Sequence, residues 1–124
     1  MTSWPGGVSA ITLFVSDVGV SKEFYLRALG LPVHWEDDVS CVFQLDGALI
    51  NLLQATEVPE LITPATAGSG PTSLLTITVD DVDATAAALT AAGVALLNGP
   101  LDRPWGIRTA SFADPDGHLW EIAK

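Results

Sequence analysis

The feature that most constrains the fold is an internal repeat that spans nearly all of the 124 residues. The segment ITLFVSDVGVSKEFYLRALGL, from Ile11, aligns with LLTITVDDVDATAAALTAAGV, from Leu75. Further along, LDGALINLL, which contains Asn51, aligns with PDGHLWEIA, which contains Glu121. A duplicated sequence indicates that one supersecondary unit is built twice. We therefore expect two similar modules.

Each copy begins with the pattern of a strand followed by a helix. Alternating apolar residues end at an aspartate, Asp17 in the first copy and Asp81 in the second. An aspartate at this position caps a helix by accepting hydrogen bonds from its free backbone N–H groups. Gly30 and Gly93 follow the helical pattern, where a left-handed C-terminal cap favours glycine. One helix is thus predicted in each copy.

Three further strands are expected after each helix, the last two joined by an Asp-Gly turn at residues 46–47 and 116–117. The segment between the copies is rich in Pro, Gly, Ser and Thr, which favour loops. The sequence therefore predicts an α+β chain with two tandem βαβββ modules in a single domain. Its parts are a first module at about 8–56, a linker at 57–72 and a second module at about 73–124.

Composition limits the partners of the chain. Fifteen acidic and five basic residues give a net charge of −10, which repels nucleic acid and anionic membranes. The single cysteine, Cys41, excludes an internal disulfide and fits a reducing compartment. Neither a secretory signal nor an apolar run long enough to span a bilayer is visible. We expect a cytoplasmic protein that binds neither nucleic acid nor membrane.

Three stretches carry a family resemblance: LFVSDVGVSKEFYLRALGL, ITVDDVDATAAALTAAG and RPWGIRTASFADPDGHLWEI. Together they resemble the vicinal oxygen chelate superfamily, which includes glyoxalases, extradiol dioxygenases, fosfomycin-resistance enzymes and bleomycin-type resistance proteins. The resemblance extends from about Ser9 to Lys124. It implies mixed sheets that curl around a cavity, usually completed in a homodimer. Whether the modules pair within one chain or by exchange between two chains is left open.

Metal-dependent members of that family place His, Gln or Glu at four inward positions. The resemblance carries these positions onto Ala10, Asn51, Leu74 and Glu121. Alanine and leucine offer no donor atom to a transition metal, and asparagine is a weak neutral donor. Glu121 is therefore the one plausible ligand, and we expect neither a bound metal nor another cofactor.

The histidines are the remaining candidates for a rearranged metal site, which would make the chain a glyoxalase-like lyase or isomerase, or a dioxygenase. Strand alternation predicts His118 on the face away from Glu121. His34 is expected to face inward only if Trp35 packs beneath a helix. A nucleophile is not evident either, because Cys41 has apolar neighbours and no adjacent base.

The predicted ligand-binding residues meet one of two criteria. They either occupy an inward-facing strand position or carry an aromatic or charged side chain that is expected close to the cavity. They are Trp105, Glu121, Phe14, Asn51, Thr76, Trp35, Phe43 and Arg108. Tryptophan offers a flat face for stacking and a quadrupole that attracts cations. Trp105, in the RPWG loop, is the favoured stacking residue, whereas alternation predicts Trp120 in the core.

Glu121 has two interpretations. It lies between Trp120 and Ile122, and a buried carboxylate without a partner is strongly unfavourable. It either contacts the ligand or forms a salt bridge with Arg108 on the neighbouring predicted strand. Arg103 and Arg108 could also polarise an oxyanion, although neutralisation of Glu121 by Arg108 is the simpler explanation.

These observations predict a metal-independent, dimeric protein that binds and sequesters an aromatic small molecule, either neutral or cationic. The RPWG stretch resembles the aromatic loop of bleomycin-type antibiotic-resistance proteins, which are acidic and lack a catalytic metal. Two alternatives remain at this point. One is the rearranged metal enzyme described above, and the other is an interaction or regulatory module with a vestigial cavity.

Overall fold

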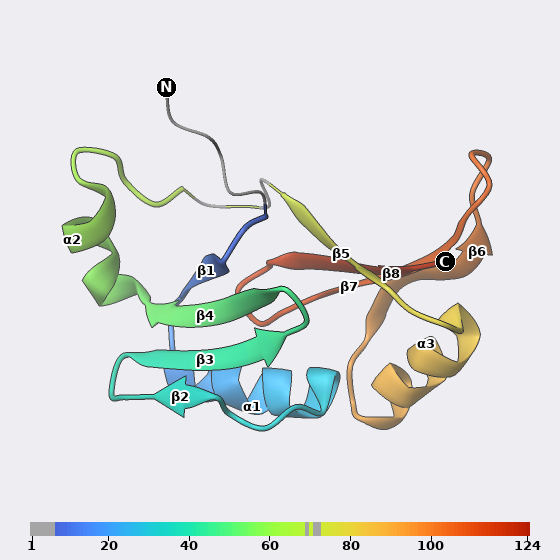
Figure 1. Cartoon of the computed structure of the whole chain (residues 1–124), viewed down its shortest axis with the longest axis horizontal. Coiled ribbons are helices and arrows are strands. Elements are labelled where there is room, and N and C mark those ends of the chain that lie inside the picture. The colour runs from blue at the N-terminus through green and yellow to red at the C-terminus, as the bar shows by residue number, and fades with distance from the viewer. Residues whose placement is uncertain (1–6, 69, 71–72) are drawn as a thin grey trace. The chain divides into compact units, whose positions relative to one another are not determined.

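The computed structural model describes residues 7–68, 70 and 73–124 (Figure 1). Within these residues the chain forms two compact units. Unit 1 comprises Leu31–Ala67 and the described part of Met1–Lys22, and unit 2 comprises Glu23–Gly30 and Gly68–Lys124. Three positions of the predicted linker, 69, 71 and 72, lie outside the described residues.

Unit 1 contains a four-stranded mixed sheet in the order β1-β4-β3-β2 (Figure 1). β1 runs parallel to β4, whereas β3 is antiparallel to both of its neighbours. The strands are β1 (Ala10–Val15), β2 (Trp35–Glu36), β3 (Ser40–Leu45) and β4 (Ala48–Gln54).

The predicted linker begins with ordered structure. A 3-10 turn (Ala55–Glu57) is followed by the short helix α2 (Val58–Ile62). Val58 is 2% exposed, and Pro59 occupies the first turn, where its missing N–H removes no helical hydrogen bond. The proline that marks a loop in the sequence therefore also starts a helix.

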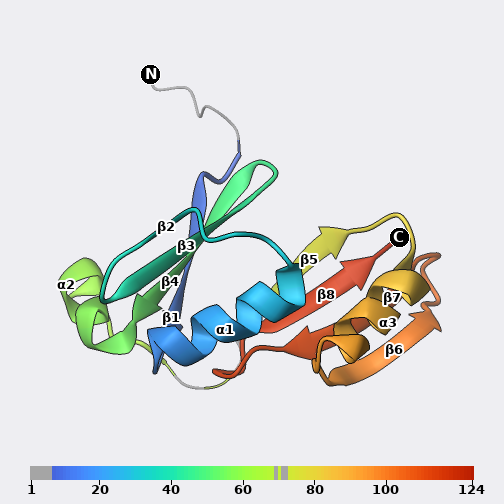
Figure 2. The ribbon, with the colours of Figure 1, turned by 90° about the horizontal axis from the view of Figure 1, so that it is seen from below.

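Unit 2 repeats the architecture with a mixed sheet in the order β5-β8-β7-β6 and the same strand directions. Figure 2 shows helix α3 against the β6–β7 side of this sheet. Together with α1, the two sheets confirm the predicted pair of βαβββ modules. The elements are β5 (Leu74–Thr78), α3 (Val82–Ala91), β6 (Leu96–Asp102), β7 (Arg108–Ala113) and β8 (Leu119–Ala123).

The two longer helices begin and end where the sequence predicts. Asp17 Oδ1 accepts hydrogen bonds from two backbone N–H groups in the first turn of α1 (Val18–Leu29), at 2.9 and 3.1 Å. Asp81 caps α3 by accepting from the Ala84 N–H at 3.0 Å. Gly30 and Gly93 follow with φ of 65° and 86°, the expected left-handed caps. In the described part of the chain, no helix is long and apolar enough to cross a membrane.

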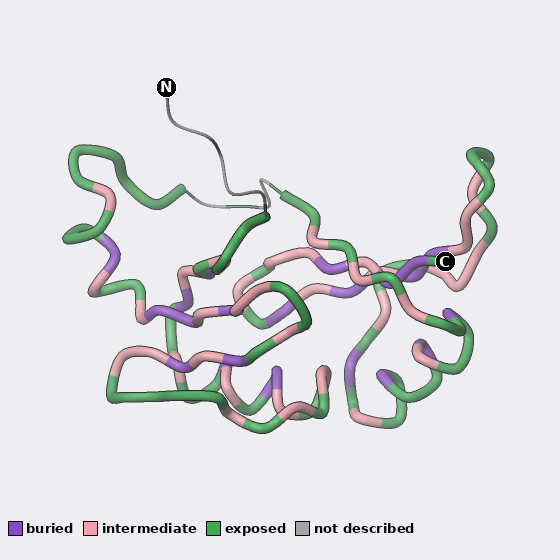
Figure 3. The backbone as a smooth tube through the Cα atoms, viewed as in Figure 1, coloured by how far each residue is buried: buried purple, intermediate pink, exposed green. Residues whose placement is uncertain are grey.

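Strand alternation predicts the covered side chains at most strand positions (Figure 3). Leu53 is an exception, because alternation predicts it on the cavity side with Asn51, yet it is only 6% exposed. The predicted covered residues of β1, β4 and β8 that are at most 7% exposed are Leu13, Val15, Ile50, Leu52, Trp120 and Ile122. Their counterparts Ile11, Leu75 and Ile77, on the edge strands β1 and β5, are half-buried.

The packed side of α1 differs from its prediction at one position. The helical spacing predicts Val20 on that side, yet Val20 is 55% exposed and Ser21 is fully buried. Phe24 and Tyr25 lie three and four residues after Ser21, so these three share one side of the helix. The two rings set the rotation, and Val20, about 100° round the helix from Ser21, turns to solvent.

Residues 23–29 of α1 belong to unit 2, where the rings of Phe24 and Tyr25 join an aromatic cluster. The Phe24 and Tyr25 rings meet edge to face at 5.2 Å, and Tyr25 lies 6.0 Å from Trp120. The Phe112 and Trp120 rings, paired across β7 and β8, are nearly parallel at 6.4 Å. The cluster fixes the end of α1 on the β7–β8 pair.

A buried polar network lies within this cluster. Asp114 is 5% exposed, and its Oδ1 accepts the backbone N–H groups of Asp116 and His118 at 2.9 and 2.8 Å. The Tyr25 hydroxyl donates to Asp114 Oδ2 at 2.7 Å and accepts from Trp120 Nε1 at 2.9 Å. The Asp-Gly turn between β7 and β8 is thereby tied to α1.

This network makes stability fall at high pH. Burial, followed by the hydrogen bond to Asp114, raises the pKa of Tyr25 well above its ordinary value. The unfolded chain loses the tyrosine proton near pH 10 while the native chain keeps it. The stability due to neutral Tyr25 is therefore complete below that pH and decreases above it. Because Tyr25 is the sole tyrosine, tyrosinate absorbance reports on it alone, and we expect none from the folded protein near pH 10.

The control for this titration is the Tyr25→Phe variant. It should lose the part of the alkaline decrease in stability that depends on the hydroxyl. It should also be less stable at neutral pH by about 1–3 kcal/mol in urea denaturation, because two buried polar groups lose a partner. A tyrosinate signal from folded wild-type protein near pH 10 would contradict the assignment.

β6 carries a β-bulge that requires glycine. Asn98 pairs with Ser111 and Leu101 with Thr109, so β6 has two residues between these pairs where β7 has one. Gly99, within the bulge, has φ of 85°, and a Cβ there would lie 2.4 Å from the Thr109 carbonyl oxygen. Only glycine allows this close approach of the two strands.

A pair of glycine variants separates the two constraints on Gly99, which are its positive φ and its close approach to the β7 backbone. Gly106 also has a positive φ, 96°, but has no neighbouring atom within 4 Å of an added Cβ. Gly106→Ala should therefore lose only the conformational preference, about 1–2 kcal/mol. Gly99→Ala should be less stable than Gly106→Ala in denaturant unfolding, because its methyl group collides with backbone. Equal stability of the two variants would refute the close approach.

Candidate functional site

One face of the unit 2 sheet carries three cross-strand rows, because residues in register on neighbouring strands share a face. We call it the Glu121 face, and it lies opposite the buried side chain of Trp120, as alternation predicts. Its rows are Leu74–Leu119–Ala113, Thr76–Glu121–Ser111 and Thr78–Ala123–Thr109. A polar row is thus followed on one side by an apolar row and on the other by a row of small side chains.

Glu121 is half-buried at the centre of the polar row. Its Oε1 accepts the hydroxyl of Thr76 at 3.1 Å, which turns the carboxylate toward β5. Two of the predicted ligand-binding residues, Thr76 and Glu121, are therefore in direct contact. A carboxylate held in this way can accept further hydrogen bonds or face a cation.

Arg108 lies on the opposite face of the same sheet. It alternates with Thr109 along β7, and its guanidinium donates twice to Asp83 of α3 at 2.8 Å and to Asp102 at 3.1 Å. Hydrogen bonding from Arg108 lowers the pKa of Asp83. Of the two interpretations of Glu121, the salt bridge with Arg108 is therefore excluded. The prediction of Arg108 as a ligand-binding residue is wrong, because Arg108 does not lie on the face predicted to bind the ligand.

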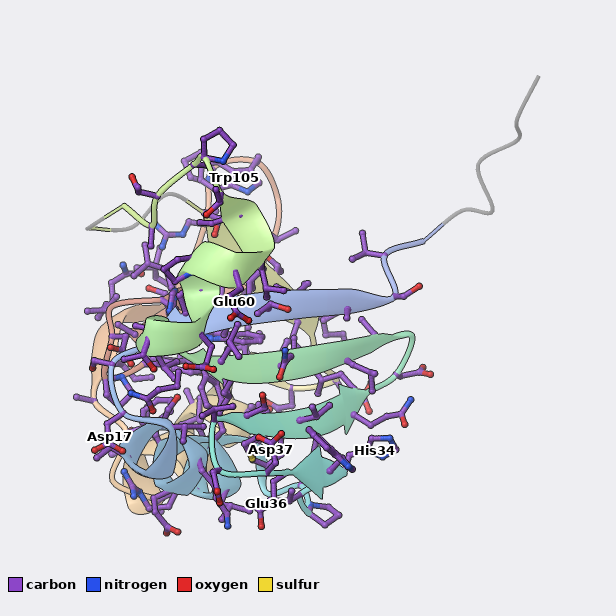
Figure 4. The ribbon with its side chains drawn as sticks, turned by 90° about the vertical axis from the view of Figure 1, so that its left-hand side faces the viewer. Asp17, His34, Glu36, Asp37, Glu60 and Trp105 are labelled. Carbon is purple, nitrogen blue, oxygen red and sulfur yellow. The ribbon has the colours of Figure 1, made fainter. Side chains whose placement is uncertain are left out.

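Trp105 stands at the end of the β6–β7 loop with 69% of its surface exposed (Figure 4). At the base of the loop, the Arg103 guanidinium lies 6.0 Å from the centre of the indole ring. Arg103 Nε donates to Thr109 Oγ1 at 2.9 Å, and Nη2 donates to Asn98 Oδ1 at 2.7 Å. Thr109 lies on the Glu121 face, and Asn98 pairs with Ser111 of the same face. These two hydrogen bonds of Arg103 therefore anchor the loop on the Glu121 face.

The sequence did not reveal this position of Arg103. The sequence indicated Arg103 only as a weak candidate for oxyanion binding. Its contact with Asn98 depends on the bulge at Gly99, which strand alternation does not predict. The adjacent Gly-Pro pair within a strand-like segment is the sequence signal that marks such an irregularity.

Unit 1 has the duplicate of this face. Its rows are Ala10–Leu49–Gln44, Thr12–Asn51–Val42–Trp35 and Phe14–Leu53–Ser40. Asn51 Nδ2 donates to Thr12 Oγ1 at 3.4 Å, while Asn51 Oδ1 is buried without a hydrogen-bond partner among the described residues. Trp35 is 54% exposed at the end of the Asn51 row. Phe14, Asn51 and Trp35 therefore share one face, as expected of them.

Two predictions in unit 1 need correction. Phe43 is fully buried and in register with Ile50, so it lies on the covered face rather than with Asn51. Trp35 does not pack beneath a helix, so the condition for an inward His34 is not met. His34 is exposed beside the start of β2 (Figure 4).

The donor set does not fit the metal that the family resemblance implies. Ala10 lies beside Leu49, and Leu74 lies beside Leu119, so two of the four positions have hydrocarbon neighbours and no donor atom. Among the described residues, no three His, Cys, Asp or Glu side chains are grouped closely enough to hold a metal ion.

Cys41 is also unsuited to catalysis. Its side chain is 1% exposed and in register with Leu52 on the covered face of unit 1. Burial, followed by the charge of Glu36, raises the pKa of the Cys41 thiol. The thiol is therefore kept protonated and away from solvent, whereas a nucleophilic cysteine needs an accessible thiolate.

Known proteins match this chain over nearly its whole length. The profile of the Glyoxalase/Bleomycin resistance protein/Dioxygenase superfamily matches residues 7–122. The uncharacterized protein YraH of Bacillus subtilis (strain 168) is 37% identical over 121 residues, which cover 92% of this chain and 94% of YraH. Two solved structures are also similar.

A glyoxalase-related enzyme from Fulvimarina pelagi has a TM-score of 0.82 and 30% identity, covering 94% of this chain and 86% of that one. A glyoxalase/bleomycin resistance protein/dioxygenase from Nocardioides has a TM-score of 0.85 and 26% identity, covering 98% and 85%. The chain therefore belongs to the glyoxalase/bleomycin resistance protein/dioxygenase superfamily.

Proposed function

We propose that the Glu121 face binds an aromatic small molecule without a metal ion, and that the protein sequesters this ligand stoichiometrically. The observation that carries the proposal is the position of Trp105. This indole is 69% exposed, and its loop is anchored on the Glu121 face through Arg103. A large exposed ring on a loop that is anchored to this face favours stacking with a planar ligand.

Glu121 and Thr76 supply the polar part of the proposed site. Their hydrogen bond of 3.1 Å occupies one carboxylate oxygen and leaves the other for a ligand donor or cation. The net charge of −10 raises the local concentration of cationic ligands, which supports the uptake of positively charged aromatic compounds.

Unit 1 supports the same function with weaker groups. Trp35 lies in the Asn51 row, which again combines an exposed indole with a polar side chain. Asn51 Oδ1 has no partner, and an unpaired buried acceptor is unfavourable by about 1–3 kcal/mol. A ligand that donates a hydrogen bond to Asn51 would recover this free energy. By analogy with bleomycin-type resistance proteins, we propose that the protein acts as a homodimer in the cytoplasm and that its ligand is an antibiotic.

A second candidate function is that of a metal-dependent lyase, isomerase or dioxygenase. The 30% identity with a glyoxalase-related enzyme from Fulvimarina pelagi favours it. The neighbours of Ala10 and Leu74 oppose it, because a metal would then need ligands outside the four family positions. His34 and His118 are the two histidines of the chain and would be the imidazole ligands of such a site.

The binding function predicts that Trp105→Ala weakens ligand binding. We expect wild-type protein to bind the neutral fluorescent probe phenylnaphthylamine at one site per chain. Loss of the stacking surface should reduce this affinity by about tenfold or more. Leu61→Ala is the matched control, because Leu61 is 67% exposed on α2 in unit 1. A Trp105→Ala affinity equal to that of wild type would overturn the proposal.

Metal content separates the two candidate functions. After dialysis against nickel, cobalt, manganese, iron and zinc in turn, elemental analysis should find far less than one ion per chain. Glu121→Gln should give the same low content, because Ala10 and Leu74 leave a metal with too few ligands. Near-stoichiometric metal in wild type that is lost in Glu121→Gln would instead favour the metal enzyme.

A further inference from the structure

We propose that Arg103 is an anion-binding residue, and that the ligand of the Glu121 face carries an anionic oxygen group next to its aromatic ring. The inference rests on the proposed function and adds the chemical class of the ligand. Aromatic carboxylates, phenolates and sulfonates belong to that class. A cationic group on the same molecule would face Glu121.

The guanidinium of Arg103 is held in place but not saturated. It is half-buried, and it donates to Thr109 Oγ1 and Asn98 Oδ1, which are both neutral oxygens. A guanidinium carries five N–H donors in a planar fork, so three remain for another acceptor. This fork matches the two oxygens of a carboxylate.

Arg103 also has no counter-ion in the described part of the chain. Lys22 pairs with Glu36 at 2.9 Å, and Arg108 pairs with two aspartates. Arg27 and Lys124 also form no ion pair among the described residues, but both are exposed to solvent, whereas Arg103 is half-buried. Asp102, the residue next to Arg103, pairs with Arg108 on the other face. What distinguishes Arg103 from Arg27 and Lys124 is that its unpaired charge is partly removed from water. A partly buried cation in this setting is stabilised by an anion that reaches it.

The β-bulge fixes the direction of the guanidinium. Asn98 is in register with Ser111, and Thr109 lies two residues before Ser111 on β7, so both acceptors belong to the Glu121 face. The bulge at Gly99 brings the Asn98 side chain to Arg103. Bulges often change the direction of a side chain next to a binding site in this way. Arg103 is therefore oriented before any ligand arrives, which lowers the entropic penalty of binding.

Trp105 and Glu121 are placed to contact the rest of the same ligand. The indole centre is 6.0 Å from the Arg103 guanidinium carbon, so a ring attached to an anion at Arg103 lies within reach of Trp105. Glu121 on β8 pairs with Ser111, which lies two residues beyond Thr109 on β7, about 7 Å along the strand. Its carboxylate turns toward β5 and away from β6, so it does not neutralise Arg103.

Two probes with the same aromatic skeleton test the inference. Anilinonaphthalene sulfonate carries an anionic group that phenylnaphthylamine lacks, and both report binding by fluorescence. Wild type should bind the sulfonate more tightly by about tenfold, the gain expected from charge-assisted hydrogen bonds. Arg103→Met should abolish this difference, so that the variant binds both probes with similar affinity. Because Arg103 also anchors the Trp105 loop, the readout is the ratio of the two affinities, and the affinity for phenylnaphthylamine alone is expected to fall.

The matched control is Arg27→Met, which removes the same charge from an exposed position in the last turn of α1. It should leave the preference for the sulfonate unchanged. Arg103→Lys keeps the charge but loses the fork, so it should retain only part of the preference. If circular dichroism shows that Arg103→Met is unfolded, the comparison of Arg103→Lys with Arg27→Met carries the test.

The outcomes distinguish this inference from the proposed function. If neither probe binds, or if Trp105→Ala binds both as wild type does, the proposed function fails. If phenylnaphthylamine binds through Trp105 but the sulfonate binds no more tightly, the binding function stands and the anion site is refuted. The anion site is also refuted if Arg27→Met weakens sulfonate binding as much as Arg103→Met does.

Discussion

The buried carboxylate of Asp114 is the interaction on which unit 2 depends. A charge at 5% exposure is tolerated only when its oxygens are hydrogen-bonded, and here two backbone N–H groups and the Tyr25 hydroxyl do so. The same carboxylate closes the turn between β7 and β8 and thereby supports their register. That register sets Glu121 beside Ser111 on the open face. A group inside the core thus determines where a group of the candidate site points.

Much of the fold was predictable because it follows from short-range chemistry. The caps at Asp17 and Asp81 depend on a side chain and the next few backbone N–H groups. The burial of Trp120 depends on a two-residue alternation that survives in any regular strand. The helical spacing of α1 was less informative, since the position of Val20 depends on which surface receives Phe24 and Tyr25.

The site was less predictable because its contacts depend on register and on approach between elements. Phe43 was assigned to the wrong face, since its pairing with Ile50 is set by the hairpin rather than by its own neighbours. A salt bridge between Arg108 and Glu121 was one of two interpretations left open, because the two residues lie on neighbouring strands, whereas the first turn of α3 brings Asp83 to Arg108. The contact between Arg103 and Asn98 arises from a bulge, which shifts the alternation that sequence reasoning uses.

The duplication explains why the two faces are similar and why their chemistry differs. Each face retains a threonine next to a polar side chain, Thr12 with Asn51 and Thr76 with Glu121. The difference comes from the edge hairpins: β2 has two residues and β6 has seven. The longer strand accommodates the bulge and supports a loop that presents an arginine and an exposed indole. Both faces carry an exposed indole, Trp35 in unit 1 and Trp105 in unit 2, so extension of one hairpin adds an arginine beside the indole of unit 2.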